Sequence, residues 1–119
     1  MDHRILLIED DADMRDALAV LLEYQGYRVT TACNGKEGLQ CLKTMERPCL
    51  ILLDLMMPVM DGWAFRSELL KLPDLADIPV VILSGVDDAD QTAERLRCVD
   101  HLAKPFPPER LYRVVETHC

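Results

Sequence analysis

Three short apolar runs constrain the fold more than any other feature of this sequence. They occupy residues 5–8, 50–53 and 80–83, and none of them alternates with polar residues. A run of this kind fits a strand that is buried on both faces, as in a parallel sheet covered by helices on each side. Residues 27–32 and 99–103 are weaker candidates for two more strands.

Helical patterns lie between and after these runs. Apolar residues at i, i+3, i+4 and i+7 begin at Met14, and Gly26 ends that pattern. Asn34 predicts the N-cap of a second helix, with Glu37 three residues later as its capping-box partner. Three further helices are expected to begin at Asp61-Gly62, to run over residues 87–97, and to begin at Pro107-Pro108.

Strands and helices therefore alternate along the whole chain. Strict alternation predicts an α/β fold with a doubly wound parallel sheet and right-handed crossovers. The 119 residues suit a single domain over residues 1–119, which is long enough to bury a substantial core.

Composition excludes several classes of function. The net charge of −8 leaves no basic footprint, so this domain alone is not expected to bind nucleic acid. No apolar run approaches the roughly 18 residues of a membrane span, and a signal peptide is not expected either. The five cysteines are odd in number and form no C-x-x-C pair, which argues against a disulfide framework or a zinc site. We expect reduced thiols in a cytoplasmic protein.

Polar residues follow four of the five predicted strands. Ligands of such sheets bind at the carboxyl ends of the strands. The residues expected to converge there are Glu9 and Asp10 after the first strand, Asp54 after the third, Ser84 after the fourth, and Lys104 after the fifth.

Three carboxylates so close together would repel one another. One like-charge pair at about 4 Å costs roughly 4 kcal/mol at an effective dielectric constant near 20. Mg²⁺ would relieve this repulsion, because it prefers carboxylate oxygens and retained water. A carboxylate beside a metal can attack phosphorus, with Lys104 and Ser84 placed to hold the phosphoryl oxygens.

At this point the sequence resembles the receiver domains of response regulators in two-component signalling. The resemblance covers essentially the whole chain and is carried by residues 5–11, 52–62, 81–85 and 101–106. It implies a flavodoxin-like sheet of five parallel strands in the order 2-1-3-4-5, with five helices. It also implies phosphoryl transfer from a histidine kinase or a histidine phosphotransfer protein, with Mg²⁺ as cofactor.

The resemblance assigns a role to each matching residue. Asp54 is the phosphoacceptor and touches the metal; Asp10 is a direct ligand, Glu9 acts through water, and the backbone carbonyl of Met56 also faces Mg²⁺. Ser84 is the switch hydroxyl and Lys104 binds the phosphoryl group. The peptide bond from Lys104 to Pro105 is expected to be cis.

Two departures from the family pattern lie on the face that is expected to bind the downstream protein. His101 stands where the family has Tyr or Phe, and only 20 positions separate Ser84 from Lys104, which predicts a short fourth helix. The expected output is a protein target bound by the face of the fourth helix, fifth strand and fifth helix, in a monomer or weak dimer. His101 is either a packing residue or a switch, and as a switch it could respond to pH.

Two other functions compete with the receiver hypothesis. A pseudo-receiver would be an interaction module of the same fold that is never phosphorylated, but it should lack one of the working groups. A small phosphohydrolase of the haloacid dehalogenase type is suggested by Asp11-Ala12-Asp13, yet Arg15 does not fit that motif. The simpler interpretation of Asp11 and Asp13 is a solvated acidic loop that caps the first helix.

Overall fold

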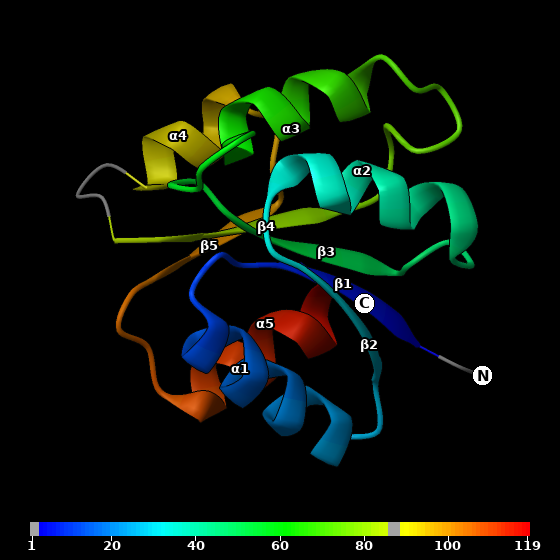
Figure 1. Cartoon of the computed structure of the whole chain (residues 1–119). Helices are drawn as coiled ribbons and strands as arrows, with labels where there is room; N and C mark the ends of the chain where they lie inside the picture. Colours follow the sequence, from blue (N-terminus) through cyan, green and yellow to red (C-terminus); the bar gives the residue numbers. More distant parts are fainter. Residues whose placement is uncertain (1–2, 86–88) are drawn as a thin grey trace.

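The computed structural model describes residues 3–85 and 89–119, except for the side chains of residues 89–91. Strands and helices alternate as predicted (Figure 1). The elements are β1 Arg4–Ile8, α1 Ala12–Tyr24, β2 Arg28–Ala32, α2 Gly35–Thr44, β3 Leu50–Asp54, α3 Gly62–Leu70, β4 Val80–Ser84, α4 Ala89–Arg95, β5 Asp100–Ala103 and α5 Pro108–His118. All strand pairs are parallel and the order is β2-β1-β3-β4-β5, which confirms the predicted fold class.

The central strands are buried on both faces, as their continuous apolar runs predict. Every residue of β3 and β4 is buried. Helices α1 and α5 cover one face of the sheet, and α2, α3 and α4 cover the other (Figure 1). Ile5 and Leu7 of β1 pack toward α1 and α5, whereas Leu6 and Ile8 pack toward α2 and α3. The strands lie parallel and in register between these two layers, so their carboxyl ends share one edge of the sheet.

The helix starts follow the capping residues expected from the sequence. Asp11 accepts hydrogen bonds from the backbone N–H groups of Asp13 and Met14, and Asn34 accepts one from Glu37. The side chain of Glu37 reaches back to the N–H of Cys33 at 3.2 Å, one residue earlier than a standard capping box would place it.

The fourth helix is short, as the spacing between Ser84 and Lys104 suggested. Among the described residues it covers Ala89–Arg95, so it ends two residues before the expected end at residue 97. Residues 87 and 88 of the expected helix lie outside the described residues. At its far end Arg97 adopts a left-handed φ of 57°, which ends the helix before residue 97.

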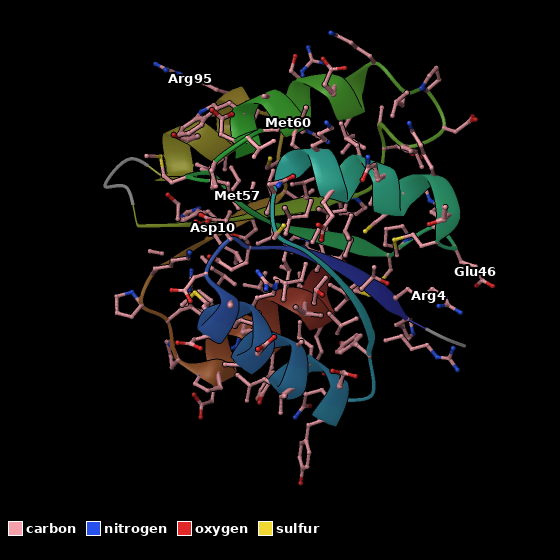
Figure 2. The ribbon with its side chains drawn as sticks, in the orientation of Figure 1. Arg4, Asp10, Glu46, Met57, Met60 and Arg95 are labelled. Atoms are coloured by element: carbon pink, nitrogen blue, oxygen red, sulfur yellow. A yellow bond between two sulfur atoms is a disulfide. The ribbon has the colours of Figure 1, made fainter. Side chains whose placement is uncertain are left out.

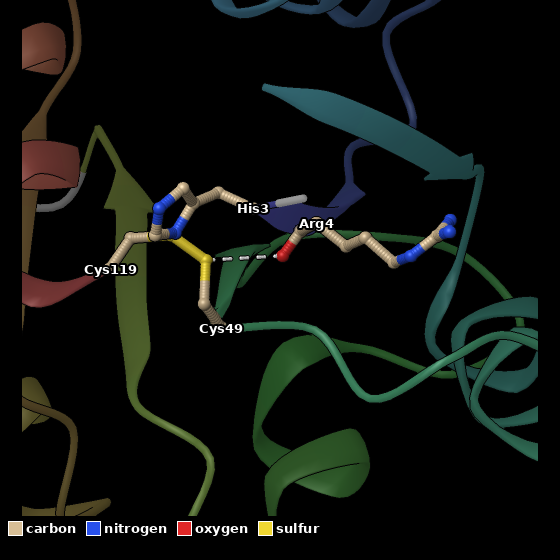
Figure 3. Close-up of a disulfide and its surroundings, with 4 residues drawn as sticks. All are labelled: His3, Arg4, Cys49 and Cys119. Atoms are coloured by element: carbon tan, nitrogen blue, oxygen red, sulfur yellow. Dashed lines mark hydrogen bonds between the residues drawn. A yellow bond between two sulfur atoms is a disulfide. The ribbon is translucent and has the colours of Figure 1, made fainter. Parts of the chain in front are cut away.

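The expectation of five reduced thiols is wrong for two of them. Cys49 and Cys119 form a disulfide with a Cα–Cα distance of 5.0 Å, whereas Cys33, Cys41 and Cys98 are free. The paired cysteines are 70 residues apart, and spacing rules that rest on short motifs carry no information about such a pair. The fold brings them together, because α5 ends beside the start of β3 (Figure 3). None of the described helices is long and apolar enough to cross a bilayer.

Candidate functional site

The carboxyl edge of the sheet gathers the acidic residues named from the sequence. Glu9 and Asp10 follow β1, and Asp54 is the last residue of β3. One carboxylate oxygen from each of the three lies within 4.8 Å of the others. Figure 2 places Asp10 at this edge, with Arg4 and Glu46 at the opposite edge. Because Glu9 and Asp54 are buried while Asp10 is exposed, the cluster has a solvent-facing side.

Lys104 supplies the positive charge of the site. Its Nζ lies 2.8 Å from Oε2 of Glu9 and 3.6 Å from Oδ1 of Asp54. The Lys104–Pro105 bond is cis, as expected. The backbone N–H of Lys104 donates to the carbonyl oxygen of Ser84 at 2.8 Å, so the ends of β4 and β5 are joined beside the site. Ser84 is buried at the end of β4, next to this junction.

The electrostatics of Asp54 are unusual for a carboxylate. Burial raises its pKa to about 7, and the negative charge of Glu9 and a hydrogen bond with Asp10 act in the same direction. The charge of Lys104 and the N–H of Met56, which donates to Oδ1 at 3.3 Å, oppose this shift without cancelling it. The ionised form is therefore destabilised until another cation arrives.

Lys104 stays charged in the same environment. Burial alone would lower the pKa of Lys104, but its hydrogen bond to Glu9 and the nearby charges of Asp54 and Glu9 raise the pKa overall. One lysine thus faces two buried carboxylates, and the cluster keeps an excess of negative charge when all groups are ionised. This excess is what a divalent cation would neutralise.

A glycine fixes the backbone that carries Asp54. A Cβ atom on Gly62 would lie 2.6 Å from the carbonyl oxygen of Asp54 and 2.8 Å from the Cα of Leu55. The N–H of Gly62 donates to the carbonyl oxygen of Leu55 at 2.9 Å. Asp61 caps α3 by accepting from the N–H of Ala64, so the Asp61-Gly62 pair starts the helix and lets it approach the site closely.

Two contributors to the site were not predicted from the sequence. Nη1 of Arg15 donates to the carbonyl oxygen of Glu9 at 2.9 Å and so holds the acidic loop. Val59 has φ of 69°, and the N–H of Met60 donates to the carbonyl oxygen of Pro58 across it at 2.8 Å. The resulting γ-turn shapes the loop after Asp54. Neither contact could be predicted, because an arginine one turn into a helix and a β-branched residue in a loop are common and do not indicate such a role.

The other named residues lie where the topology requires. His101 pairs in register with Ile82, two residues before Ser84, so it is half-buried within β5 and not at the carboxyl edge. Met56 is exposed in the loop after β3. Asp11 caps its own helix, which fits the simple interpretation of the Asp11-Ala12-Asp13 sequence as a capping loop.

The parallel sheet and this edge of acids and lysine match the receiver architecture expected from the sequence, and comparison with known proteins agrees. The model of the response regulator receiver domain family matches residues 5–116, so the chain belongs to that family. It is a receiver domain of the two-component type.

Individual relatives extend the comparison. The chain is 38% identical over 111 residues to the probable transcriptional regulator ycf27 of Porphyridium aerugineum, covering 92% of this chain and 45% of that protein. It therefore spans less than half the length of the ycf27 regulators that it matches.

Two solved structures share the fold. The signal receiver domain of a signal transduction histidine kinase from Syntrophus aciditrophicus matches with a TM-score of 0.87 and 32% identity, over 97% of this chain and 88% of that one. Response regulator protein TrrA from Thermotoga maritima, solved in complex with Mg²⁺-BeF, matches with a TM-score of 0.86 and 25% identity, over 98% and 99% of the two chains.

Proposed function

We propose that Asp54 accepts a phosphoryl group from a phosphohistidine on a histidine kinase or a histidine phosphotransfer protein. The observation that carries this proposal is a buried carboxylate, with a pKa raised to about 7, between two other acids and a lysine. An oxygen of Asp54 forms the new O–P bond while the P–N bond of the phosphohistidine breaks, and the imidazole leaves with a proton.

The acidic cluster fits Mg²⁺. Carboxylate oxygens are the ligands that this ion prefers, and Asp10, Asp54 and the backbone carbonyl of Met56 would be its protein ligands. Glu9 would act through water, since its Oε2 is already bound by Lys104 at 2.8 Å. Mg²⁺ would neutralise charge on the phosphoryl group, and the solved Mg²⁺-BeF complex of TrrA supports the same use here.

Lys104 and Ser84 would hold the phosphoryl oxygens. Lys104 is already within 3.6 Å of Asp54, and Ser84 ends the neighbouring strand. A change at Ser84 would pass along β4 to Ile82, which pairs in register with His101 on β5. We infer that residues 1–119 act as one switch domain in the cytoplasm, as a monomer or weak dimer, and signal to a protein partner through the face of α4, β5 and α5.

A small-molecule phosphodonor tests the acceptor directly. With Mg²⁺, intact-mass measurement should show the gain of one phosphoryl group in the wild type, and removal of Mg²⁺ by a chelator should prevent it. Asp54→Asn should abolish the gain, whereas Asp74→Asn, which changes an exposed acid remote from the cluster, should leave it intact. A phosphoryl gain that survives Asp54→Asn would reject the assignment.

A pseudo-receiver is the alternative that the same experiment separates. It would show no phosphoryl gain, and it would bind its protein partner equally well with and without the phosphodonor. Because Glu9, Asp10 and Lys104 all converge on Asp54 in the fold, the geometry favours the phosphorylated switch.

A further inference from the structure

The disulfide lies at the amino edge of the sheet, away from the acidic cluster. Cys119 caps the end of α5, and Cys49 directly precedes β3. Nδ1 of His3 lies 3.9 Å from Sγ of Cys119, and Sγ of Cys49 lies 3.2 Å from the carbonyl oxygen of Arg4 (Figure 3). The pair thus ties three segments together: the start of β1, the start of β3 and the end of α5.

We propose that Cys49 and Cys119 form a reversible thiol–disulfide site that reacts with low-molecular-weight disulfides, in which Cys119 is the attacking thiol and His3 accepts its proton. This inference does not rest on phosphorylation of Asp54. Both cysteines are half-buried and His3 is exposed, so a small reagent can reach the sulfur atoms.

The two sulfur atoms have different neighbours, and this assigns their roles. In the reduced state the imidazole of His3 can take the proton of the Cys119 thiol, leaving the thiolate that acts as nucleophile. Cys49 instead faces a carbonyl oxygen, to which a thiol can donate but which does not favour a thiolate. Cys119 is therefore suited to attack first, and Cys49 to resolve the product.

The chemistry balances in two exchanges. The Cys119 thiolate attacks one sulfur of the external disulfide, forms a mixed disulfide, and releases one thiolate, which takes up the proton held by His3. Cys49 then loses its proton and attacks Sγ of Cys119, which closes the internal disulfide and releases the second external thiol. Two protein thiols are oxidised to one disulfide, and one external disulfide is reduced to two thiols.

The three remaining cysteines are poorly suited to this reaction. Burial raises the pKa of Cys98 to about 11. A hydrogen bond to Glu37 raises the pKa of Cys33, and burial raises that of Cys41. These thiols stay protonated near neutral pH, so oxidation should select the pair at the amino edge.

Closing the disulfide constrains α5. Leu111, Val114 and Val115 anchor this helix in the core, and Nε2 of His118 lies 3.1 Å from Oδ2 of Asp100 on β5. The disulfide adds a covalent link from Cys119, the next residue, to Cys49 at the start of β3. Among the described residues, reduction would leave the last turn of α5 tied to the rest of the domain by core packing and by the contact between His118 and Asp100.

Equilibration with mixtures of reduced and oxidised glutathione tests the site in the intact chain. After rapid alkylation, peptide mass spectrometry should show Cys49 and Cys119 becoming protected together as the mixture becomes more oxidising, while Cys33, Cys41 and Cys98 remain alkylated. Cys49→Ser should trap glutathione on Cys119, and the matched control Cys41→Ser should behave as the wild type. If Cys119 stays fully alkylated in every mixture, or if glutathione accumulates on Cys119 in the wild type, the proposal fails.

The role of His3 is tested by separating rate from endpoint. His3→Gln should slow oxidation of the reduced protein about tenfold or more, because the proton acceptor is lost. The final ratio of dithiol to disulfide should change little, which a merely structural role would not predict. An unchanged rate in His3→Gln would remove His3 from the mechanism. Stoichiometric Zn²⁺ binding by the reduced protein that blocks its oxidation would overturn the exchange site in favour of a metal site.

Discussion

The two edges of the sheet bring reactive groups together in different ways. At the carboxyl edge, charged residues directly follow buried strands, and Lys104 compensates part of their charge at 2.8 Å from Glu9. At the amino edge, His3, Cys49 and Cys119 come from the start of β1, the start of β3 and the end of α5, and a covalent bond joins two of them. The carboxyl edge therefore holds like charges that repel one another, whereas the disulfide at the amino edge stabilises the fold.

This difference decides how each edge responds to its surroundings. The carboxyl edge is sensitive to protons and cations, since its acids are buried against one another. The amino edge is sensitive to the thiol–disulfide balance, because its link exists only in the oxidised state.

Removal of the Lys104 charge should cause the largest loss of stability. Lys104→Met leaves Glu9, which is 1% exposed, as a buried carboxylate without its cation. Breaking a buried pair in this way costs about 3–5 kcal/mol in free energy of unfolding. Urea denaturation should show this loss, and the double variant with Glu9→Gln should recover much of it.

Lys71 provides the matched control for this prediction. Its Nζ lies 3.1 Å from Oε1 of Glu68, but both side chains are exposed. Lys71→Met should therefore change the free energy of unfolding by less than about 1 kcal/mol. If the two substitutions had equal effects, the buried carboxylate of Glu9 would not depend on the charge of Lys104.

Reduction of the disulfide should produce the next largest effect. The link joins residues 70 apart in the sequence, and closing a loop of this size typically stabilises a protein by roughly 2–4 kcal/mol. The midpoint of urea unfolding should fall when a reductant is added. The double variant Cys49→Ser/Cys119→Ser should have the reduced midpoint and should not respond to reductant. A double variant that still responds would place the effect elsewhere.

Stability should fall as the pH rises, through Asp54. Its pKa is raised to about 7 in the folded protein, against about 3.9 when unfolded. The folded state therefore binds more protons between these values, and stability is lost as the pH rises through this window. The free energy of unfolding attributable to Asp54 should be roughly 2–3 kcal/mol lower at pH 8 than at pH 5.

Substitution of Asp54 and addition of Mg²⁺ separate this contribution from others. Asp54→Asn should flatten the pH dependence and be more stable than the wild type at pH 8. Mg²⁺ should raise the melting temperature of the wild type more at pH 8 than at pH 5, and much less in Asp54→Asn. An equally steep pH dependence in the variant would assign the proton uptake to another group.

The sequence predicted the carboxyl edge well for a physical reason. Each acid is adjacent to a buried apolar run, so topology alone brings Glu9 and Asp54 together. The link between Cys49 and Cys119 could not be predicted, because it depends on the direction in which α5 leaves the sheet and on the length of its last turn. The same limit applies to Arg15 and Val59. Their contacts depend on loop geometry, which the residue type alone does not predict.

Val59 offers the smallest and most local test of the carboxyl edge. It is β-branched, 78% exposed, and has φ of 69°, a region that costs such residues about 1 kcal/mol or more. Val59→Asn should therefore raise the free energy of unfolding by about 1 kcal/mol, since asparagine tolerates this conformation and no buried contact is lost. Urea unfolding measures the gain, and Val20→Asn, at an exposed position on α1, controls for the polar substitution. If Val59→Asn were destabilising, Val59 would be held by contacts that outweigh its backbone strain, and the loop after Asp54 would be shaped by packing instead of by the γ-turn.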